Sequence, residues 1–564
     1  MSFPPFAAEM LARAATSRKR AGTIAGLAGR VRCAMFRGIS ARGPRRIASI
    51  AAMLAILLAT QLACLSVSPA PTPVRAAIQT PGWFRDVVLY EIFTRSFYDA
   101  SGDGIGDLKG VTAKLGYLQE LGVGAIWLTP IFASPSYHGY DVTDYYRVNP
   151  DFGSEADLVD LVSQAHRRNI RVLLDFVAPH TSDQHPFFKD AFGNLASRYA
   201  DWYRWKDPRH LSYESFAGVQ TMPTLNHDNP EVQDYLIGVA KYWMKTGIDG
   251  YRCDYVLNVP HGFWKRLRAE LKAISPDFLL LAEAWTTIQA IKPYFDDEFD
   301  AAFDFPVYHD IQGNQDRVGD SLLLGKLAPQ LLDTNLNAGP ILFPAGAQRV
   351  KFLNNHDTDR VMSEVQGDPR RARLAATLLL TLPGTPMLYY GEEIGTSGVK
   401  APAPDYDKTR REPMDWYAAE AGPGMTTWYR PEGRNNQPND GFSVQEQQGQ
   451  PSSLLEHYRA LVALRNANPA LRTGPRLALR LPGDSKVYAY LRQDAASVFV
   501  VVLNFGGLPE GVSLDLSAAS LAAGQYTAVD RLSGIVVTWV NMKGATLDLE
   551  AAASRGYVFQ LVSR

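Results

Sequence analysis

The stretch GIDGYRCDYV, residues 247–256, resembles a buried strand that nevertheless carries an arginine and a carboxylate. Side chains alternate between the two faces of a strand, so Arg252 and Asp254 point to one side and Cys253 to the other. A structural ion pair would explain the two charges by themselves, and Cys253 is expected to be a small buried residue. The segments around this strand decide what the charged pair is for.

Eight short apolar runs are spaced along residues 87–391, and amphipathic stretches separate them. Apolar strands that alternate with helices are typical of a parallel sheet covered on both faces, and eight such units predict an α/β fold, a closed (β/α)₈ TIM barrel. A doubly wound open sheet is the alternative, but no glycine-rich phosphate loop follows the first strand. The expected strands are 87–93, 125–130, 171–177, 247–254, 278–284, 301–307, 350–356 and 386–391. The expected helices are 108–121, 154–168, 231–246, 262–274, 317–333, 369–382 and 453–467.

Two segments interrupt or follow this repeating pattern. The stretch 181–229, after the third strand, is too long for a plain loop and predicts a small inserted subdomain. Beyond about residue 475 the helical pattern stops, and six short runs with turn residues between them predict an antiparallel β-sandwich over 475–564. The barrel and its insertion are therefore expected over residues 81–470.

The first 80 residues differ from the rest of the chain. The basic stretch RGPRR (42–46) precedes 21 uncharged residues, 47–67, and a Pro/Ser-rich spacer follows. A basic flank, an apolar run and small residues are typical of an export signal, and the run is also long enough to serve as an uncleaved membrane anchor. Cys64 raises lipidation as a further alternative, although Gln61 stands where a lipobox has an apolar residue. We expect a protein that is secreted or anchored to the outer face of the cell membrane.

The composition of the chain argues against two classes of protein. The net charge is −1, so no broad electrostatic attraction to nucleic acid is expected. Two of the three cysteines fall within the first 80 residues, so no disulfide framework is expected.

Charged residues crowd the carboxyl ends of the predicted barrel strands, which is where barrel enzymes place their active sites. Burying several like charges is costly unless the protein needs them there. Glycoside cleavage needs one ionised and one protonated carboxyl group. We expect Arg252 to lower the pKa of Asp254, and apolar burial to raise the pKa of Glu283. The full set at these strand ends is Asp175, His180, Arg252, Asp254, Glu283, His356 and Asp357.

Four of these strand ends, together with two further segments, resemble the short motifs of the alpha-amylase family, glycoside hydrolase family 13. The motifs are DFVAPH (175–180), GYRCDYVLN (250–258), LLAEAW (280–285) and FLNNHD (352–357), with MPTLN (222–226) and LPGTPMLYYGEE (382–393) in support. The resemblance implies retaining double displacement, with Asp254 as nucleophile, Glu283 as acid/base and Asp357 as transition-state stabiliser. It also implies that Asp175 is structural and that the cleaved sugar ring is bound by Tyr140, His180, Arg252 and His356.

The loop DASGDGIGD, 99–107, alternates oxygen-bearing residues with small ones. Such a loop is either a solvated Asp/Gly turn or a site for one hard cation. It resembles the calcium loop of oligo-1,6-glucosidase-like members of the family, which implies a structural Ca²⁺. The implied ligands are Asp99, Ser101, Asp103, the carbonyl of Ile105, and Asp107. Pro179 and Thr224 stand where the family holds a different calcium, so that second site is not implied.

Substrate preference is indicated by one departure from the family pattern. Exo-acting alpha-glucosidases of the family have an aspartate three positions before the stacking tyrosine, and here Tyr137 occupies that position. The expected activity is therefore hydrolysis of alpha-1,4 bonds in starch-like glucans or maltooligosaccharides. Two alternatives stay open, namely a transglycosylase or trehalose-synthase-like enzyme on the same site, and a non-catalytic amylase-like subunit anchored to a membrane. Nothing in the sequence indicates the oligomeric state.

Overall fold

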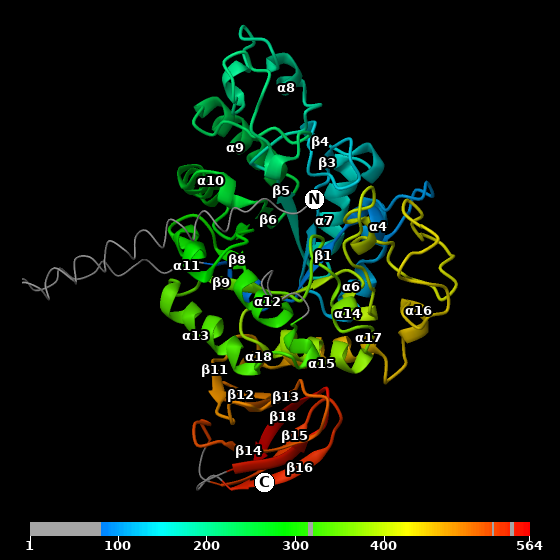
Figure 1. Cartoon of the computed structure of the whole chain (residues 1–564), viewed down its shortest axis with the longest axis vertical. Helices are drawn as coiled ribbons and strands as arrows, with labels where there is room; N and C mark the ends of the chain where they lie inside the picture. The colour runs from blue at the N-terminus through cyan, green and yellow to red at the C-terminus, as the bar shows by residue number, and fades with distance from the viewer. Residues whose placement is uncertain (1–79, 314–319, 522–523, 542–545, 564) are drawn as a thin grey trace, which may run out of the picture. The chain divides into compact units, whose positions relative to one another are not determined.

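The computed structural model describes residues 80–313, 320–521, 524–541 and 546–563 (Figure 1). All but the last residue of the predicted leader and spacer lies outside these ranges, so the export signal and the anchor stay predictions. Within the described part of the chain, no helix is both long enough and apolar enough to cross a bilayer.

The central element of the fold is a closed barrel of eight parallel strands in the order β1-β10-β9-β8-β7-β6-β5-β2. This arrangement confirms the predicted barrel and excludes the open sheet. The strands are β1 (Leu89–Ile92), β2 (Ala125–Leu128), β5 (Arg171–Phe176), β6 (Gly250–Cys253), β7 (Leu279–Ala282), β8 (Ala301–Phe303), β9 (Gln348–Lys351) and β10 (Thr385–Tyr389).

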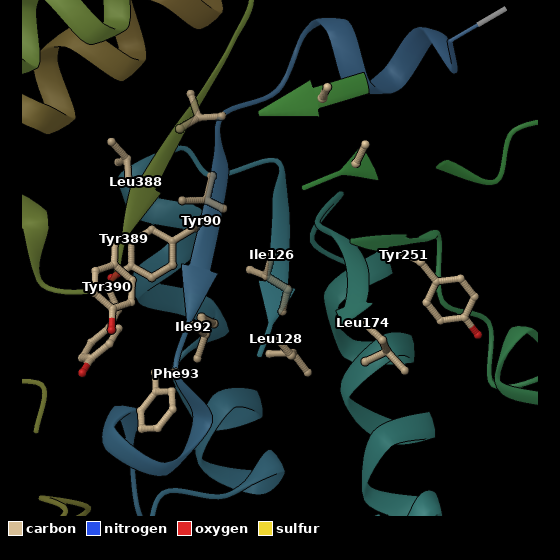
Figure 2. Packing of buried hydrophobic residues seen from close by; sticks show 14 of the residues in the cluster. Tyr90, Ile92, Phe93, Ile126, Leu128, Leu174, Tyr251, Leu388, Tyr389 and Tyr390 are labelled. Atoms are coloured by element: carbon tan, nitrogen blue, oxygen red, sulfur yellow. The ribbon is translucent and has the colours of Figure 1, made fainter. Parts of the chain in front are cut away.

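Successive side chains of the barrel strands alternate between the barrel interior and the surrounding helices. Outward residues join the large core between barrel and helices, and Figure 2 shows Tyr90, Ile92 and Ile126 among them. Inward residues such as Trp127 form a separate buried cluster. At the carboxyl ends the inward positions change from apolar to acidic, in the pairs Leu89 and Glu91, Leu173 and Asp175, and Leu281 and Glu283.

Gly250 allows β6 to lie close to its two neighbouring strands inside the barrel. A Cβ atom at this position would come within 2.6 Å of both the Leu173 Cδ2 atom and the Leu279 carbonyl oxygen. Only glycine fits such an approach. Arg252 follows two residues later on the same inward face, so the strand carries its charged pair at the top of a narrow barrel.

The helices begin and end largely where the sequence pattern predicts. In α7, for example, Ser154 and Asp157 form a capping box, a feature of about 1 kcal/mol. The helices are α3 (Gly82–Arg85), α4 (Thr94–Phe97), α5 (Leu108–Ala113), α6 (Leu115–Leu121), α7 (Glu155–His166), α8 (Pro186–Ala191), α9 (Pro230–Met244), α10 (His261–Ile274), α11 (Ile288–Ile291), α12 (Phe305–Gln312), α13 (Leu332–Leu342), α14 (Val361–Glu364), α15 (Pro369–Thr381), α16 (Val444–Gln447), α17 (Leu454–Ala467) and α18 (Pro469–Arg472).

The predicted helix over 317–333 is wrong. Of its described part, 320–333, the first twelve residues contain two short 3₁₀ turns, and only the last two belong to a helix, α13, which begins at Leu332. Gly325 adopts a left-handed conformation with φ of 70°, and Pro329 starts a new turn, so both residues interrupt the apolar pattern. The predicted strand 301–307 also ends early, at Phe303, because the Asp304 side chain caps α12.

Two further regions lie between strands of the barrel. Between β5 and α9 lies irregular chain that contains α8 and isolated β-bridges, as expected of an insertion. A small sheet of β3 (Phe132–Ala133) and β4 (Asp144–Val148) between β2 and α7 was not predicted. The boundaries drawn at 80, 181, 229, 470 and 475 stay predictions.

The C-terminal region contains two antiparallel sheets, one of six strands and one of two. A buried apolar cluster, including Val500 and Leu514, is formed by residues of both sheets. The opposite face of the larger sheet joins the main core, where the Tyr490 hydroxyl lies 2.6 Å from the Thr381 hydroxyl of α15. The strands are β11 (Arg476–Leu479), β12 (Val487–Gln493), β13 (Val498–Asn504), β14 (Glu510–Asp515), β15 (Gln525–Asp530), β16 (Val536–Asn541), β17 (Thr546–Ala551) and β18 (Arg555–Ser563), of which β11 and β14 were not predicted.

Candidate active site

Arg252 lies at the centre of a buried group of carboxylates at the carboxyl ends of β5, β6 and β7. Its Nη1 atom donates to Asp254 Oδ1 at 2.9 Å and to both carboxylate oxygens of Asp175, at 3.0 and 2.9 Å. Its Nη2 atom lies 2.8 Å from Glu283 Oε2. The guanidinium is 1% exposed, and its carbon atom lies 4.9 Å from the centre of the Trp127 ring. One guanidinium therefore holds three carboxylates against a single wall of the barrel.

The two oxygens of Asp254 have different surroundings. Arg252 binds Oδ1, whereas Oδ2 is buried and has no hydrogen-bond partner among the described residues. Cys253 points away into the outer core, as the strand alternation predicted. The arrangement holds one oxygen of Asp254 in place and leaves the other free to react.

The chain turns sharply after Asp254, and this turn also positions Glu283. Tyr255 adopts a left-handed conformation with φ of 36° and ψ of 56°, which is uncommon for a bulky residue. Its amide N–H donates to Glu283 Oε2 at 2.7 Å. Backbone strain of this kind clusters at functional sites and persists only where surrounding contacts enforce it. The turn thereby couples the orientation of Glu283 to the end of β6.

Burial dominates the electrostatics of both carboxyl groups. It raises the pKa of Glu283 to about 7, with Arg252 opposing and Asp254 and Asp357 adding to the rise, as the sequence analysis expected. Burial also raises the pKa of Asp254 to about 7, although Arg252 opposes it. The expectation that Arg252 keeps the pKa of Asp254 low is therefore wrong, because burial outweighs the attraction of a guanidinium that two other carboxylates also contact. Asp175 shares Arg252 Nη1 with Asp254, and burial raises the pKa of Asp175 to about 6, so these two acids titrate together.

Asp357 has the opposite character, since cations surround it. Its Oδ1 lies 3.0 Å from Arg411 Nη2, and its Oδ2 lies 3.1 Å from His356 Nε2. Burial opposes ionisation, but His356 and Arg411 hold the pKa of Asp357 well below its usual range. Its side chain is 35% exposed, so this carboxylate is the most accessible of the three implied catalytic acids. The site thus contains one firmly ionised acid beside two acids that titrate near neutrality.

The residues implied to bind sugar lie beside this group. The Tyr140 hydroxyl donates to Asp175 Oδ2 at 3.1 Å and lies 2.8 Å from His356 Nε2, and the two rings stack at 5.5 Å. His180 Nε2 lies 3.1 Å from the Tyr140 carbonyl oxygen. Burial lowers the pKa of His180 to about 3, so its ring is neutral. The structure brings together all seven implied catalytic and sugar-binding residues.

The loop 99–107 does not form a cluster of acidic ligands. Within the described ranges, no three His, Cys, Asp or Glu side chains are grouped closely enough to hold a metal ion. Asp99 accepts from the amides of Gly102 and Gly104 at 2.6 and 2.7 Å, and Asp107 caps α5 through Gly110. Ser101 contacts both ends of the loop, since its Oγ donates to Asp99 and its amide donates to Asp107, and the Ala100 amide also donates to Asp107. The Ca²⁺ prediction is therefore not confirmed.

Two charged residues at the site were not singled out from the sequence. Glu91 is an isolated acid in the apolar first strand, and that isolation could have marked it. Its Oε1 lies 2.5 Å from His356 Nδ1. Arg411 belongs to irregular chain after β10, where no periodic pattern could have placed it near Asp357.

Comparison with known proteins agrees with this geometry. The family model described as alpha amylase, catalytic domain, matches residues 91–474. Alpha-amylase 3 of Dictyoglomus thermophilum is 34% identical over 442 residues, which cover 75% of this chain and 85% of that protein. A trehalose synthase/amylase of Mycobacterium tuberculosis is 34% identical over 529 residues, with coverage of 77% of this chain and 84% of that protein.

A solved structure gives the same result. The crystal structure of alpha-amylase from H. orenii matches with a TM-score of 0.73 and 33% sequence identity, and the match covers 84% of this chain and 99% of that chain. A barrel of this topology, a charged group at the carboxyl ends of its strands, and these similarities all point to one family. The chain belongs to the alpha-amylase family of glycoside hydrolases, family 13.

Proposed function

We propose that the chain hydrolyses alpha-1,4-glucosidic bonds in starch-like glucans or maltooligosaccharides with retention of configuration. The observation that supports this most directly is the pairing of Asp254 and Glu283 on the two terminal nitrogens of Arg252. Retaining enzymes need two carboxyl groups about 5–5.5 Å apart. A shared guanidinium keeps the two groups on the same side of the barrel mouth.

In the proposed reaction, Oδ2 of ionised Asp254 attacks the anomeric carbon while protonated Glu283 donates its proton to the leaving oxygen. A covalent glycosyl-enzyme forms and the leaving sugar departs as an alcohol. Glu283, now ionised, then takes a proton from water, and the water oxygen displaces Asp254. Because the pKa of Glu283 is raised to about 7, this carboxyl group still carries a proton to donate at near-neutral pH.

The remaining residues hold the sugar at the cleaved bond. Asp357 is ionised and partly exposed, so it can accept hydrogen bonds from sugar hydroxyls as positive charge develops at the anomeric carbon. Tyr140 supplies an aromatic face, and His180, Arg252 and His356 supply polar atoms around it. An extended substrate is favoured because position 137, where exo-acting members carry an aspartate, holds a tyrosine whose ring centre lies 5.7 Å from the Arg411 guanidinium.

Hydrolysis is tested by incubating the protein with maltooligosaccharides of defined length and following the anomeric protons by NMR. The expected first product has the alpha configuration, and the Glu283→Gln variant is expected to be inactive. Equal absence of turnover in both proteins would favour the non-catalytic subunit. Inversion of configuration would exclude Asp254 as nucleophile.

A transglycosylase or trehalose-synthase-like activity is the second candidate, and the similarity to a trehalose synthase/amylase favours it. The same NMR experiment distinguishes it, since transfer yields longer oligosaccharides or a 1,1-linked disaccharide in place of free reducing ends.

Calcium and location complete the proposal. Asp99, Ser101, Asp103, Asp107 and the carbonyl of Ile105 would hold a structural Ca²⁺ that tightens the loop 99–107, and the convergence of Ser101 on both Asp99 and Asp107 supports this. Export, followed by secretion or anchoring at the outer face of the membrane, is proposed from the basic and apolar leader.

A further inference from the structure

Glu91 is a buried carboxylate that the reaction proposed above does not use. It lies on β1, points into the barrel and is 0% exposed. A buried carboxylate is costly unless a partner compensates it. An apolar residue, like its neighbours on the strand, would suffice for packing at this position. We therefore looked for a function in the contacts of Glu91.

Among the described residues, the Glu91 side chain has hydrogen-bond partners on His356 alone. Its Oε1 lies 2.5 Å from His356 Nδ1 and accepts from the backbone amide of the same residue at 3.4 Å. Its Oε2 is buried and has no hydrogen-bond partner among the described residues. A carboxylate on one ring nitrogen fixes the orientation of an imidazole and raises its basicity.

The other ring nitrogen of His356 faces the substrate side of the site. Nε2 lies 2.8 Å from the Tyr140 hydroxyl and 3.1 Å from Asp357 Oδ2. Stacking on Tyr140 and an edge contact with Trp127, 5.6 Å between ring centres, hold the ring plane. Both nitrogens therefore face oxygen atoms, and only the protonated ring has two N–H groups to donate.

We propose that Glu91 is a positioning residue that keeps His356 protonated, so that His356 holds Asp357 ionised and aimed at the substrate. The chain of contacts runs from Glu91 through both nitrogens of one ring to a carboxylate at the site. Its parts come from β1 and from the segment after β9, which are 265 residues apart in the sequence.

The surrounding charges are consistent with this role. Burial alone would lower the pKa of His356, but Asp357 and Glu91 outweigh it and raise that pKa to about 10. Arg411 lies close by, and its Nε donates to the His356 carbonyl oxygen at 2.9 Å. Titratable and charged groups face His356 or its partners from every neighbouring element. They include Glu91 from β1, Tyr140 and His138 from the loop before β4, Asp175 from β5, Arg252 and Asp254 from the end of β6, Glu283 from the end of β7, the adjacent Asp357, Tyr389 from β10, and Arg411 from the chain after β10.

Replacing Glu91 with glutamine tests the charge while keeping the shape. The matched control is Glu298→Gln, because Glu298 is also buried and lies 2.9 Å from the Nδ1 atom of His261, a pair that lies outside the catalytic and sugar-binding residues. The first readout is the pH titration of histidine rings by NMR. The chain has ten histidines, and the His356 signal is identified as the one missing from a His356→Asn variant.

In the wild type, His356 is expected to remain protonated above about pH 8. In Glu91→Gln its titration should fall by about 1–3 pH units, the usual effect of one adjacent opposite charge. Glu298→Gln should leave the His356 signal unchanged. A wild-type His356 that titrates near about pH 6.5, or one that does not move in Glu91→Gln, would overturn the proposal.

The second readout is the pH profile of kcat/KM on a maltooligosaccharide, which rests on the proposed hydrolysis. Glu283, with a pKa of about 7, starts the alkaline limb in every variant. Above about pH 8 that limb should fall more steeply in Glu91→Gln, where His356 also loses its proton, and keep the wild-type slope in Glu298→Gln. Glu91→Asp keeps the charge, so its alkaline limb should lie closer to that of the wild type. Absence of wild-type turnover would contradict the proposed function alone, because the NMR titration needs no activity. If Glu91→Gln does not fold, Glu91→Asp provides the test, because it keeps the negative charge. A His356 pKa in Glu91→Asp near about 6.5, the value of a histidine without a charged partner, would refute the role of charge.

Discussion

Replacement of Glu283 by glutamine should stabilise the protein while abolishing its activity, and the size of the effect follows from the site. Burial raises the pKa of Glu283 from 4.5 to about 7. A carboxyl group whose pKa is raised on folding costs little below its unfolded value and costs most above its folded value. At about 1.36 kcal/mol per pH unit, the raised pKa of Glu283 costs about 3 kcal/mol of stability at about pH 8, where the group is ionised, and about 1 kcal/mol at about pH 5, where it is protonated in the folded protein.

Glutamine removes this cost because it cannot ionise, and its side-chain oxygen can still accept from the Tyr255 amide. The two costs differ by about 2 kcal/mol between the two pH values. Divided by the unfolding entropy of a chain of this length, at about 2.1 cal/mol/K per residue, this difference corresponds to about 2 °C in Tm. Thermal denaturation of wild type and Glu283→Gln at both pH values measures it. Glu120→Gln, at a side chain 66% exposed, is the control.

The reasoning would be refuted if Glu283→Gln changed Tm equally at both pH values, or destabilised the protein more at the higher one. Activity should fall by about 10²–10⁴-fold, the usual contribution of a general acid. A variant that is more stable but less active would show that the buried carboxyl group of Glu283 costs folding stability and is needed for catalysis.

Three further predictions concern other parts of the structure. Arg252→Met leaves carboxylates such as Asp254 without their cation and should lower the free energy of unfolding by about 3–5 kcal/mol at neutral pH, measured by urea denaturation. The loss should be smaller at about pH 4, where the acids are protonated, and an equal loss at both pH values would contradict the role of charge. Tyr137→Asp places a carboxylate near Arg411 and should shift the products from maltooligosaccharides toward single glucose units, as measured by chromatography. An unchanged product profile would argue against Tyr137 as the determinant of an open cleft. A chelator should lower Tm if the loop 99–107 binds Ca²⁺, and an unchanged melting curve would count against that site.

The barrel could be predicted from the sequence because its cause is local. A parallel strand that is buried on both faces needs an apolar run, and each run is followed by a stretch whose apolar residues recur with the 3.6-residue period of a helix. Strand alternation likewise placed Arg252 and Asp254 on one side, and the structure joins them at 2.9 Å. The prediction failed over 317–333, where Gly325 and Pro329 interrupt an apolar segment that otherwise resembles a helix.

The sequence by itself determined which strands carry charge at their carboxyl ends, since the motif residues and their alternation can be counted along the chain. Only the tertiary structure decided which distant groups meet and how much water reaches them. Glu91 reaches His356 across 265 residues, and Arg411 reaches Asp357 from irregular chain. The direction of the Asp254 pKa shift also depended on the fold, because burial and the sharing of one guanidinium depend on elements that no local pattern specifies.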